Sequence, residues 1–272
     1  MARVLRILAP NAGPFTLEGT NTWIVGACPS IVIDPGPADP GHLREVRREA
    51  EPVAAILVTH HHPDHAPGAA ILAGQTGAPV LAFRPEAGER ELEDGARVPA
   101  GGCVLQAVHA PGHTSDHLVF LEPETGSLFT GDAVLGRGTS VIDPSEGDMA
   151  AYMRSLTTMA ALGPRVIYPG HGPAVWSAMD KLREYEEHRR ERERQVLAAL
   201  EAGPSTAEQV VPRIYTEYPS ELHPAAARSV LAHLLKLLGE GGVVRVGSPG
   251  EERFALAHGT LPSQTKKRSG RT

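Results

Sequence analysis

Four histidines fall within six consecutive positions of the sequence, a density that points to metal binding. They belong to the segment 59–65, Thr-His-His-His-Pro-Asp-His, which directly follows the apolar stretch Val53–Val58. A wholly apolar stretch of this length is typical of a strand buried on both faces, and the end of such a strand is a common place for a functional site. His60 and His62 are two residues apart, so in extended backbone they share a face and can reach one ion.

The last two residues of the segment, Asp64 and His65, can serve a second position beside the first. They lie beyond Pro63, where the chain is expected to turn. His61 alternates with His60 and His62, so its side chain is expected to face away from the ions.

Three more candidate ligands, His113, Asp132 and His171, occur downstream. Each follows a predicted strand and stands directly after a glycine, and glycine permits the sharp turn that swings the next side chain inward. This shared context predicts one common site. Because all seven candidates offer nitrogen or oxygen atoms, the set suits Zn²⁺, with Mn²⁺ and Fe²⁺ as alternatives.

A mixed framework in the first 170 or so residues must position these side chains. Helices are expected at His42–Ala50, Gly68–Gln75 and Asp148–Leu162, the last with Asp148 as its N-cap. Strands are predicted at nine β-branched or apolar stretches: Val4–Leu8, Asn21–Gly26, Ser30–Asp34, Val53–Val58, Pro79–Phe83, Cys103–Val108, His117–Glu122, Ser127–Thr130 and Arg165–Tyr168. This order favours an α+β fold in which two sheets pack face to face with helices outside.

The remainder of the chain has a different character. A long charged helix is expected at Met179–Leu200, and a second helix should open at Ser205 with a capping box in which Glu208 reaches back. A third helix, Pro224–Leu238, precedes two short strands, Val243–Val246 and Arg253–Leu256. Three helices followed by a hairpin is the order of a winged-helix unit. We therefore expect a catalytic domain at 1–176, a winged-helix-like domain at 177–258 and a disordered tail at 259–272.

The order HxHxDH, then His, then Asp, then His resembles the metallo-β-lactamase superfamily. The resemblance implies an αββα sandwich with a C-terminal winged-helix-like α/β appendage, and a dinuclear metal-dependent hydrolase. It also implies the division of ligands: one ion is bound by His60, His62 and His113, the other by Asp64, His65 and His171, and Asp132 bridges the two.

The implied pair of ions explains why no serine or cysteine nucleophile is needed. Two ions ~3.5–4 Å apart can share a hydroxide, and they lower the pKa of water toward ~7. The second ion can polarise the carbonyl or phosphoryl oxygen of the substrate. Asp64 and Asp132 are the expected catalytic carboxylates, with Asp64 also able to hold the attacking hydroxide.

Several segments resemble the lactamase-β-like branch that includes single-strand-specific endoribonucleases. They are residues 13–23, residues 168–173 and the helix that carries His188 and Arg189. This resemblance makes single-stranded RNA the expected substrate, with Arg189, Arg190, Arg192 and Arg194 as phosphate contacts. The alternative is a thioesterase or a glyoxalase II-like hydrolase of a small or carrier-bound acyl thioester. A DNA-binding regulator is disfavoured, because the helix Pro224–Leu238 carries only two basic residues.

Composition and charge narrow the class of protein further. Hydrophobic residues make up 41% of the 272 residues and charged residues 21%, which excludes wholesale disorder. Two cysteines exclude a disulfide scaffold and are expected to be buried. No apolar run approaches the ~20 residues that span a bilayer, and no secretory signal is evident, so a cytoplasmic protein with no membrane partner is expected.

Residues 1–180 carry 11 basic and 20 acidic residues, a net charge of −9, whereas the whole chain has a net charge of −6. An acidic domain is unfavourable for binding a polyanion such as RNA.

Overall fold

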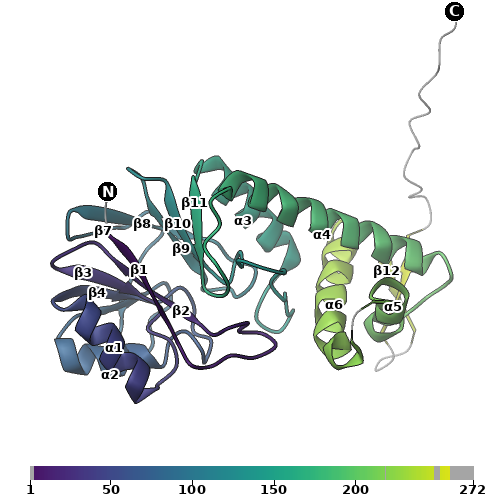
Figure 1. Ribbon diagram of the computed structural model, residues 1–272. Coiled ribbons are helices and arrows are strands. Elements are labelled where there is room, and N and C mark those ends of the chain that lie inside the picture. Colours follow the sequence, from purple (N-terminus) through teal and green to yellow (C-terminus); the bar gives the residue numbers. More distant parts are fainter. Residues whose placement is uncertain (1–2, 218, 248–251, 258–272) are drawn as a thin grey trace, which may run out of the picture. The chain divides into compact units, whose positions relative to one another are not determined.

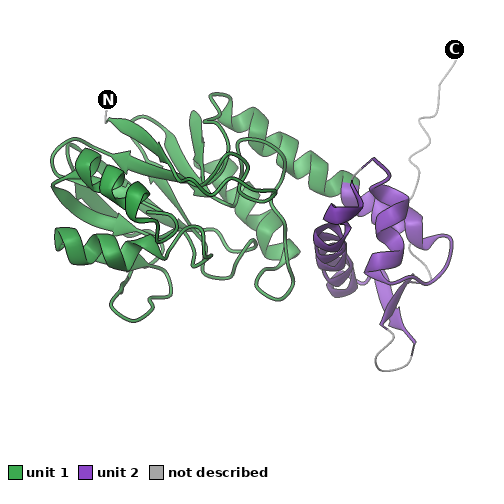
Figure 2. Ribbon diagram, turned by 60° about the horizontal axis from the view of Figure 1, so that its bottom comes forward, with its two compact units in different colours: residues 1–191 green, residues 192–272 purple. Residues whose placement is uncertain are grey.

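The computed structural model describes residues 3–217, 219–247 and 252–257. The chain divides into two compact units, residues 1–191 and 192–272 (Figure 2). The division falls inside the helix α4 (Ala178–Leu200), whereas the sequence places the boundary before that helix, at 176/177. The expected tail, 259–272, lies outside the described residues.

The first sheet of unit 1 contains six strands in chain order among the described residues. The first three pair antiparallel, and each later strand pairs parallel to the one before it. Its strands are β1 (Val4–Leu8), β2 (Asn21–Val25), β3 (Ser30–Ile33), β4 (Val53–Leu57), β5 (Val80–Ala82) and β6 (Arg90–Glu91). Two helices, α1 (Pro40–Ala50) and α2 (Gly68–Thr76), pack on one face of this sheet.

The second sheet has five described strands in the order β11-β10-β9-β8-β7. Their bounds are β7 (Arg97–Ala100), β8 (Cys103–His109), β9 (Leu118–Glu122), β10 (Ser127–Gly131) and β11 (Val166–Pro169). Figure 1 shows α3 (Met149–Ala161) beside this second sheet. Asp148 caps α3 as predicted, accepting a hydrogen bond from the backbone N–H of Ala151.

The core lies between the two sheets. Alternation along β2 directs Trp23 and Val25 into this core and Ile24 toward the layer with α1 and α2. The central strands of the first sheet are thus covered on both faces, which accounts for the uninterrupted apolar stretch that forms β4. The unit is an αββα sandwich, as the sequence predicts.

The strands that precede the candidate ligands end at a common edge. β3 and β4 are parallel neighbours, so Asp34 and residues 59–65 emerge side by side. β10 and β11 are also parallel, which brings Asp132 and His171 together. β8 and β10 are both antiparallel to β9 and therefore share a direction, so His113 emerges at the same end of the second sheet.

Unit 2 is built from the end of α4 and two further helices, α5 (Ala207–Ile214) and α6 (His223–Gly239), with a 3₁₀ turn, η1 (Ser220–Leu222), before α6. The strands β12 (Val243–Val246) and β13 (Arg253–Leu256) form the expected antiparallel hairpin. The predicted cap of α5 is wrong by one residue. Thr206 and Gln209 form the capping box, because Ser205 pairs with Phe254 of β13 through backbone hydrogen bonds.

Two expectations about exposure have different outcomes. Cys103 is buried as predicted, but Cys28 is exposed.

Among the described residues, none of the helices combines the length and apolar character needed to cross a bilayer.

Candidate metal centre

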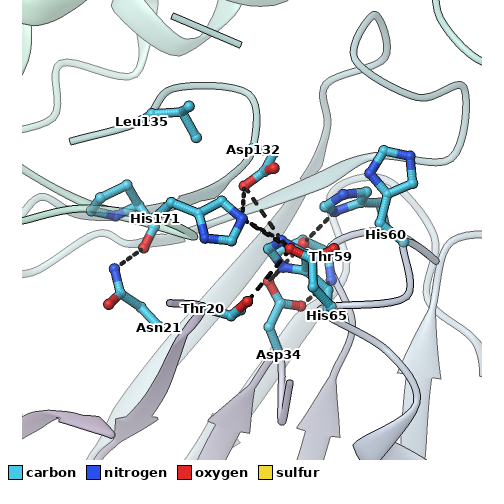
Figure 3. Close-up of polar contacts among 12 residues, drawn as sticks. Thr20, Asn21, Asp34, Thr59, His60, His65, Asp132, Leu135 and His171 are labelled. Atoms are coloured by element: carbon cyan, nitrogen blue, oxygen red, sulfur yellow. Dashed lines mark hydrogen bonds and ion pairs between the residues drawn. The ribbon is translucent and has the colours of Figure 1, made fainter. Parts of the chain in front are cut away.

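The structure brings all seven predicted ligands together at the common strand edge. Figure 3 shows His60, His65, Asp132 and His171 among them. Three overlapping groups have their ligand atoms within 4.8 Å of one another: His60, His62 and His113; His60, His65 and Asp132; and Asp64, His65 and His171. The first and third groups are the two ligand sets that the resemblance implies.

Asp132 spans the two ligand sets. Its Oδ1 atom lies 3.4 Å from Nε2 of both His65 and His171, and its Oδ2 atom lies 3.9 Å from Nε2 of His113. Within the sets, Nε2 of His113 is 3.1 Å from Nδ1 of His62, and Oδ2 of Asp64 is 3.1 Å from Nε2 of His171. A carboxylate with one oxygen toward each set is suited to bridge two cations.

Two buried polar atoms at the centre support this interpretation. Nε2 of His60 and Oδ1 of Asp132 are buried and have no hydrogen-bond partner. An unsatisfied polar atom is costly to bury, and one cation in each ligand set would satisfy both atoms. The residues present therefore fit a pair of divalent ions.

The electrostatic environment favours the ligand-competent protonation states of His60 and Asp132. Burial, with His65 close by, lowers the pKa of His60 well below its usual value and keeps the imidazole neutral. Burial alone would raise the pKa of Asp132, but the imidazoles of His65 and His171 lower it well below its usual value. Asp132 is thus ionised and His60 offers a lone pair.

Hydrogen bonds on the far side of each imidazole orient the candidate ligands. The Thr59 hydroxyl donates to Asp34 at 2.8 Å and lies 2.9 Å from Nδ1 of His60. Nδ1 of His65 faces Asp34 directly at 2.9 Å. Such contacts fix the tautomer and leave the other nitrogen for an ion.

The same arrangement recurs at the remaining histidines. Nδ1 of His113 faces the carbonyl oxygen of Val141 at 2.9 Å, and Nδ1 of His171 faces that of Gly19 at 3.2 Å. His62 instead presents Nε2 to the exposed Glu146 at 2.8 Å. This contact leaves Nδ1 of His62, not Nε2, directed at His113.

The glycine before His171 is required by close packing. A Cβ atom at Gly170 would lie 2.5 Å from Oδ1 of Asp132 and 2.7 Å from Cε1 of His65, distances that exclude a side chain. Gly112 and Gly131 have positive φ angles of 143° and 47°. The sharp turn that the sequence predicts before a ligand is therefore present at these two glycines.

His61 points away from the metal centre, as alternation predicts. Its Nδ1 atom lies 2.7 Å from Asp116 and its Nε2 atom 2.9 Å from Glu89. The hydrogen bond to Asp116 opposes the effect of burial and, with Glu89, raises the pKa of His61 to about 9. The side chain thus links two loops through two partly buried ion pairs.

Two further residues support the ligands: the sequence analysis missed Asp34, and for His117 it favours packing within a strand over a role beside the ligands. Asp34 is buried and contacts both Thr59 and His65. His117 is fully buried, stacks on His60 with ring centroids 4.8 Å apart, and accepts the backbone N–H of Asp132 at 3.2 Å. The signal for Asp34 was present, because it ends the predicted strand before Val53–Val58 and so fits the strand-end rule that located the ligands.

One of the four phosphate contacts expected on α4, Arg189, is wrong. Its side chain is buried, with 3% of the residue exposed, so it cannot reach a phosphate. Arg192 is partly buried, lies 4.3 Å from the ring centroid of Tyr215 and donates to the carbonyl oxygen of Ile214. Arg190 is exposed and forms an ion pair with Glu186, and Arg194 is also exposed.

Comparison with known proteins agrees with this architecture. Residues 15–171 match the Metallo-beta-lactamase superfamily, and residues 206–253 match the Beta-lactamase associated winged helix domain. A solved beta-lactamase domain protein from Burkholderia ambifaria superposes with a TM-score of 0.82 at 23% identity, covering 94% of this chain and 91% of its own. This likeness shows the fold.

Two fungal relatives are similar over most of their length. The lactamase-like protein aptB of Emericella nidulans is 38% identical over 253 residues, covering 86% of this chain and 81% of the relative. An atrochrysone carboxyl ACP thioesterase of Aspergillus chevalieri is 34% identical over 271 residues, covering 93% of this chain and 87% of the relative. With its αββα sandwich and its His/Asp centre, this chain belongs to the metallo-β-lactamase superfamily and is a hydrolase.

Proposed function

We propose that the protein is a dinuclear zinc-dependent thioesterase that hydrolyses an acyl thioester, with a carrier-bound acyl group as the favoured substrate. The observation that carries the hydrolytic chemistry is Asp132, whose two oxygens face the two ligand sets. The substrate class is supported by the 34% identity to an ACP thioesterase over 93% of this chain. The donor set, five imidazoles and two carboxylates without a thiolate, suits Zn²⁺.

Each residue of the centre has a definite part in this reaction. His60, His62 and His113 would hold one ion, Asp64, His65 and His171 the other, and Asp132 would bridge them. When bound, two Zn²⁺ ions supply a nucleophilic hydroxide near neutral pH and polarise the thioester carbonyl. Attack forms a C–O bond, the C–S bond breaks, and the products are a carboxylic acid and a thiol.

Asp64 is placed to act on the nucleophile. It is the more accessible of the two carboxylates, with 24% of its side chain exposed against 13% for Asp132. Because one of its oxygens faces His171, the other can accept a hydrogen bond from the attacking group and hold its lone pair toward the carbonyl carbon. Asp132, enclosed by imidazoles, is left to position the ions.

Cleavage of single-stranded RNA is the second candidate, and it rests on the resemblance of three sequence segments. Burial of Arg189 removes one of its four proposed phosphate contacts. The exposed pair Arg190 and Arg194 remains testable. If RNA is the substrate, R190A/R194A should weaken RNA binding and flatten its salt dependence without changing hydrolysis of a small thioester.

A substrate panel tests the proposal. An acyl group on a carrier protein, S-lactoylglutathione, labelled single-stranded RNA and a chromogenic β-lactam are each incubated with wild-type protein, with chelator and with D132A. Chelator-sensitive release of thiol from a thioester, lost in D132A, is the expected result. Chelator-sensitive cleavage of RNA with no thioester turnover would reject the thioesterase in favour of the endoribonuclease.

A further inference from the structure

A buried arginine stands behind the bridging carboxylate, and the proposed reaction leaves it unused. Arg189 lies on α4 within unit 1, with 3% of the residue exposed. Its Cζ atom lies 5.1 Å from the ring centroid of Tyr152, and its Nη2 atom donates to the carbonyl oxygen of Ser140 at 2.5 Å. Its Nε atom has no hydrogen-bond partner.

The segment 132–140, which begins with Asp132, is the structure that Arg189 touches. Ser140 is 4% exposed, and its hydroxyl donates back to the carbonyl oxygen of Asp132 at 2.5 Å. Arg189 therefore holds the residue that in turn holds the backbone of Asp132. The connection from the guanidinium to the bridging residue is two hydrogen bonds long.

Two buried tyrosines restrain the same segment. The hydroxyl of Tyr152, on α3, donates to the carbonyl oxygen of Ala133 at 2.6 Å. The hydroxyl of Tyr185, on α4, accepts the backbone N–H of Leu135 at 2.8 Å. The backbone after Asp132 is thus fixed by side chains from two helices.

An arginine is a costly residue for mere packing at this position. Within the described chain, no carboxylate oxygen lies within 4 Å of the Arg189 guanidinium, and an unpaired buried charge is destabilising relative to an apolar side chain of similar size. A methionine would fill the same space against Tyr152 without this cost. The arginine differs from a methionine in the hydrogen bond that it donates to Ser140.

We propose that Arg189 is a positioning residue for Asp132, acting through Ser140 to set where the carboxylate stands between the two ligand sets. This inference rests on the proposed metal-bridging role of Asp132. It predicts that loss of the guanidinium weakens metal binding even when the fold is kept, because the backbone of segment 132–140 gains freedom. Outer contacts of this kind typically change metal affinity ~10–100-fold.

R189M tests the proposal, with R183M as the matched control. Arg183 lies on the same helix but is exposed and forms an ion pair with Asp180. Metal content after competition with a chelator, the melting temperature of the metal-free protein, and kcat and KM are measured for each. R189M should bind metal about 10–100-fold more weakly than wild type. Its kcat should fall by a larger factor than its KM changes, and the melting temperature of the metal-free protein should not be lower than that of wild type. R183M should match wild type.

Separate outcomes identify which idea fails. Wild-type protein that binds no metal would reject the proposed function itself. If wild type and R189M both bind two ions with equal affinity, only the role of Arg189 is rejected. If R189M does not fold, S140A decides, because it removes just the hydroxyl that joins Ser140 to the Asp132 carbonyl; S140A with wild-type metal affinity overturns the proposed route.

Discussion

The Oδ2 atom of Asp34 lies 2.9 Å from Nδ1 of His65 and accepts a hydrogen bond from the Thr59 hydroxyl at 2.8 Å. Thr59 in turn lies 2.9 Å from Nδ1 of His60. His60 belongs to the first ligand set and His65 to the second. One buried carboxylate therefore orients an imidazole in each set, which couples the geometry of the two ion positions.

D34N should lower metal affinity ~10–100-fold. One oxygen of Asp34 accepts the backbone N–H of Thr59 at 2.8 Å, and the other faces the Thr59 hydroxyl and His65. An amide has only one acceptor oxygen, so its NH2 group would face donors on one of these two sides. The backbone should tolerate the change, because Asp34 has φ of 49° and asparagine adopts this region readily. Metal content under chelator competition is the measurement.

D39N is the control for the substitution at Asp34. Asp39 caps α1 by accepting the backbone N–H of His42 at 2.7 Å, and asparagine is an equally good N-cap. Its metal content should equal that of wild type. Equal metal affinity in D34N and D39N would show that Asp34 does not orient the ligands.

Metal analysis of protein purified without chelator should approach two divalent ions per chain. Removal of the ions should abolish hydrolysis and lower the melting temperature, because ligands that bind the folded state stabilise it. Calorimetry with and without EDTA measures the second effect. Full activity in EDTA with no bound metal would contradict the assignment of the centre.

D132A should lower metal content and turnover together. Turnover should fall more than about 100-fold, because mutation of even the residues that hydrogen-bond to a metal ligand typically lowers metal affinity or activity ~10–100-fold. The physical reason is that Asp132 is the residue with oxygens toward both ligand sets. Circular dichroism checks that the fold is retained. Wild-type metal content and rate in D132A would show that the bridge is misassigned.

The sequence allowed prediction of the fold and of the seven ligands for one physical reason. Strand ends can be recognised locally, from apolar stretches such as Val53–Val58 that stop at a polar turn, and parallel neighbours bring their ends to one edge. The strands β6 and β7 were missed, because β6 has only two residues, both exposed, and β7 is interrupted by Pro99.

Side-chain environments that depend on packing across the fold could not be predicted in this way. The charged run 183–194 of α4 looks like a uniform solvated face, yet Arg189 is buried against Tyr152 while Arg190 is exposed. That difference is set by α3 and segment 132–140, which lie far away in sequence. Similarly, Thr206 displaces Ser205 as the cap of α5 because Phe254, about 50 residues later, pairs with Ser205.

H61A should affect stability more than metal binding. The side chain joins Asp116 and Glu89 and is 17% exposed, so its removal should cost ~1–2 kcal/mol of unfolding free energy. Its ring is directed away from the ions, and metal content should be unchanged. H62A, one residue along, is the comparison and should lose metal. A metal content in H61A as low as that in H62A would contradict the outward orientation.

E193Q should destabilise the protein in a pH-dependent manner. Glu193 accepts a hydrogen bond from Lys236 at 2.7 Å and lies 3.9 Å from His233. Burial alone would raise the pKa of Glu193, but His233 and Lys236 lower it in the folded protein. A carboxyl whose pKa is lowered by folding stabilises the protein above its unfolded-state pKa, ~4.3, and loses that contribution as the pH falls through the folded-state pKa.

Urea unfolding at pH 7 and at successively lower pH measures this contribution. At pH 7, E193Q should be ~1 kcal/mol less stable than wild type, and the difference should shrink below about pH 4 as Glu193 itself becomes protonated. Lys236 stays charged throughout this range, because its pKa is raised above 10.5 against the effect of burial, so it does not contribute to the change. E240Q is the control: Glu240 also pairs with Lys236 but is 52% exposed, and its loss should cost less at every pH. A constant difference between E193Q and wild type down to pH 3 would show that the Glu193 carboxylate contributes nothing through its charge.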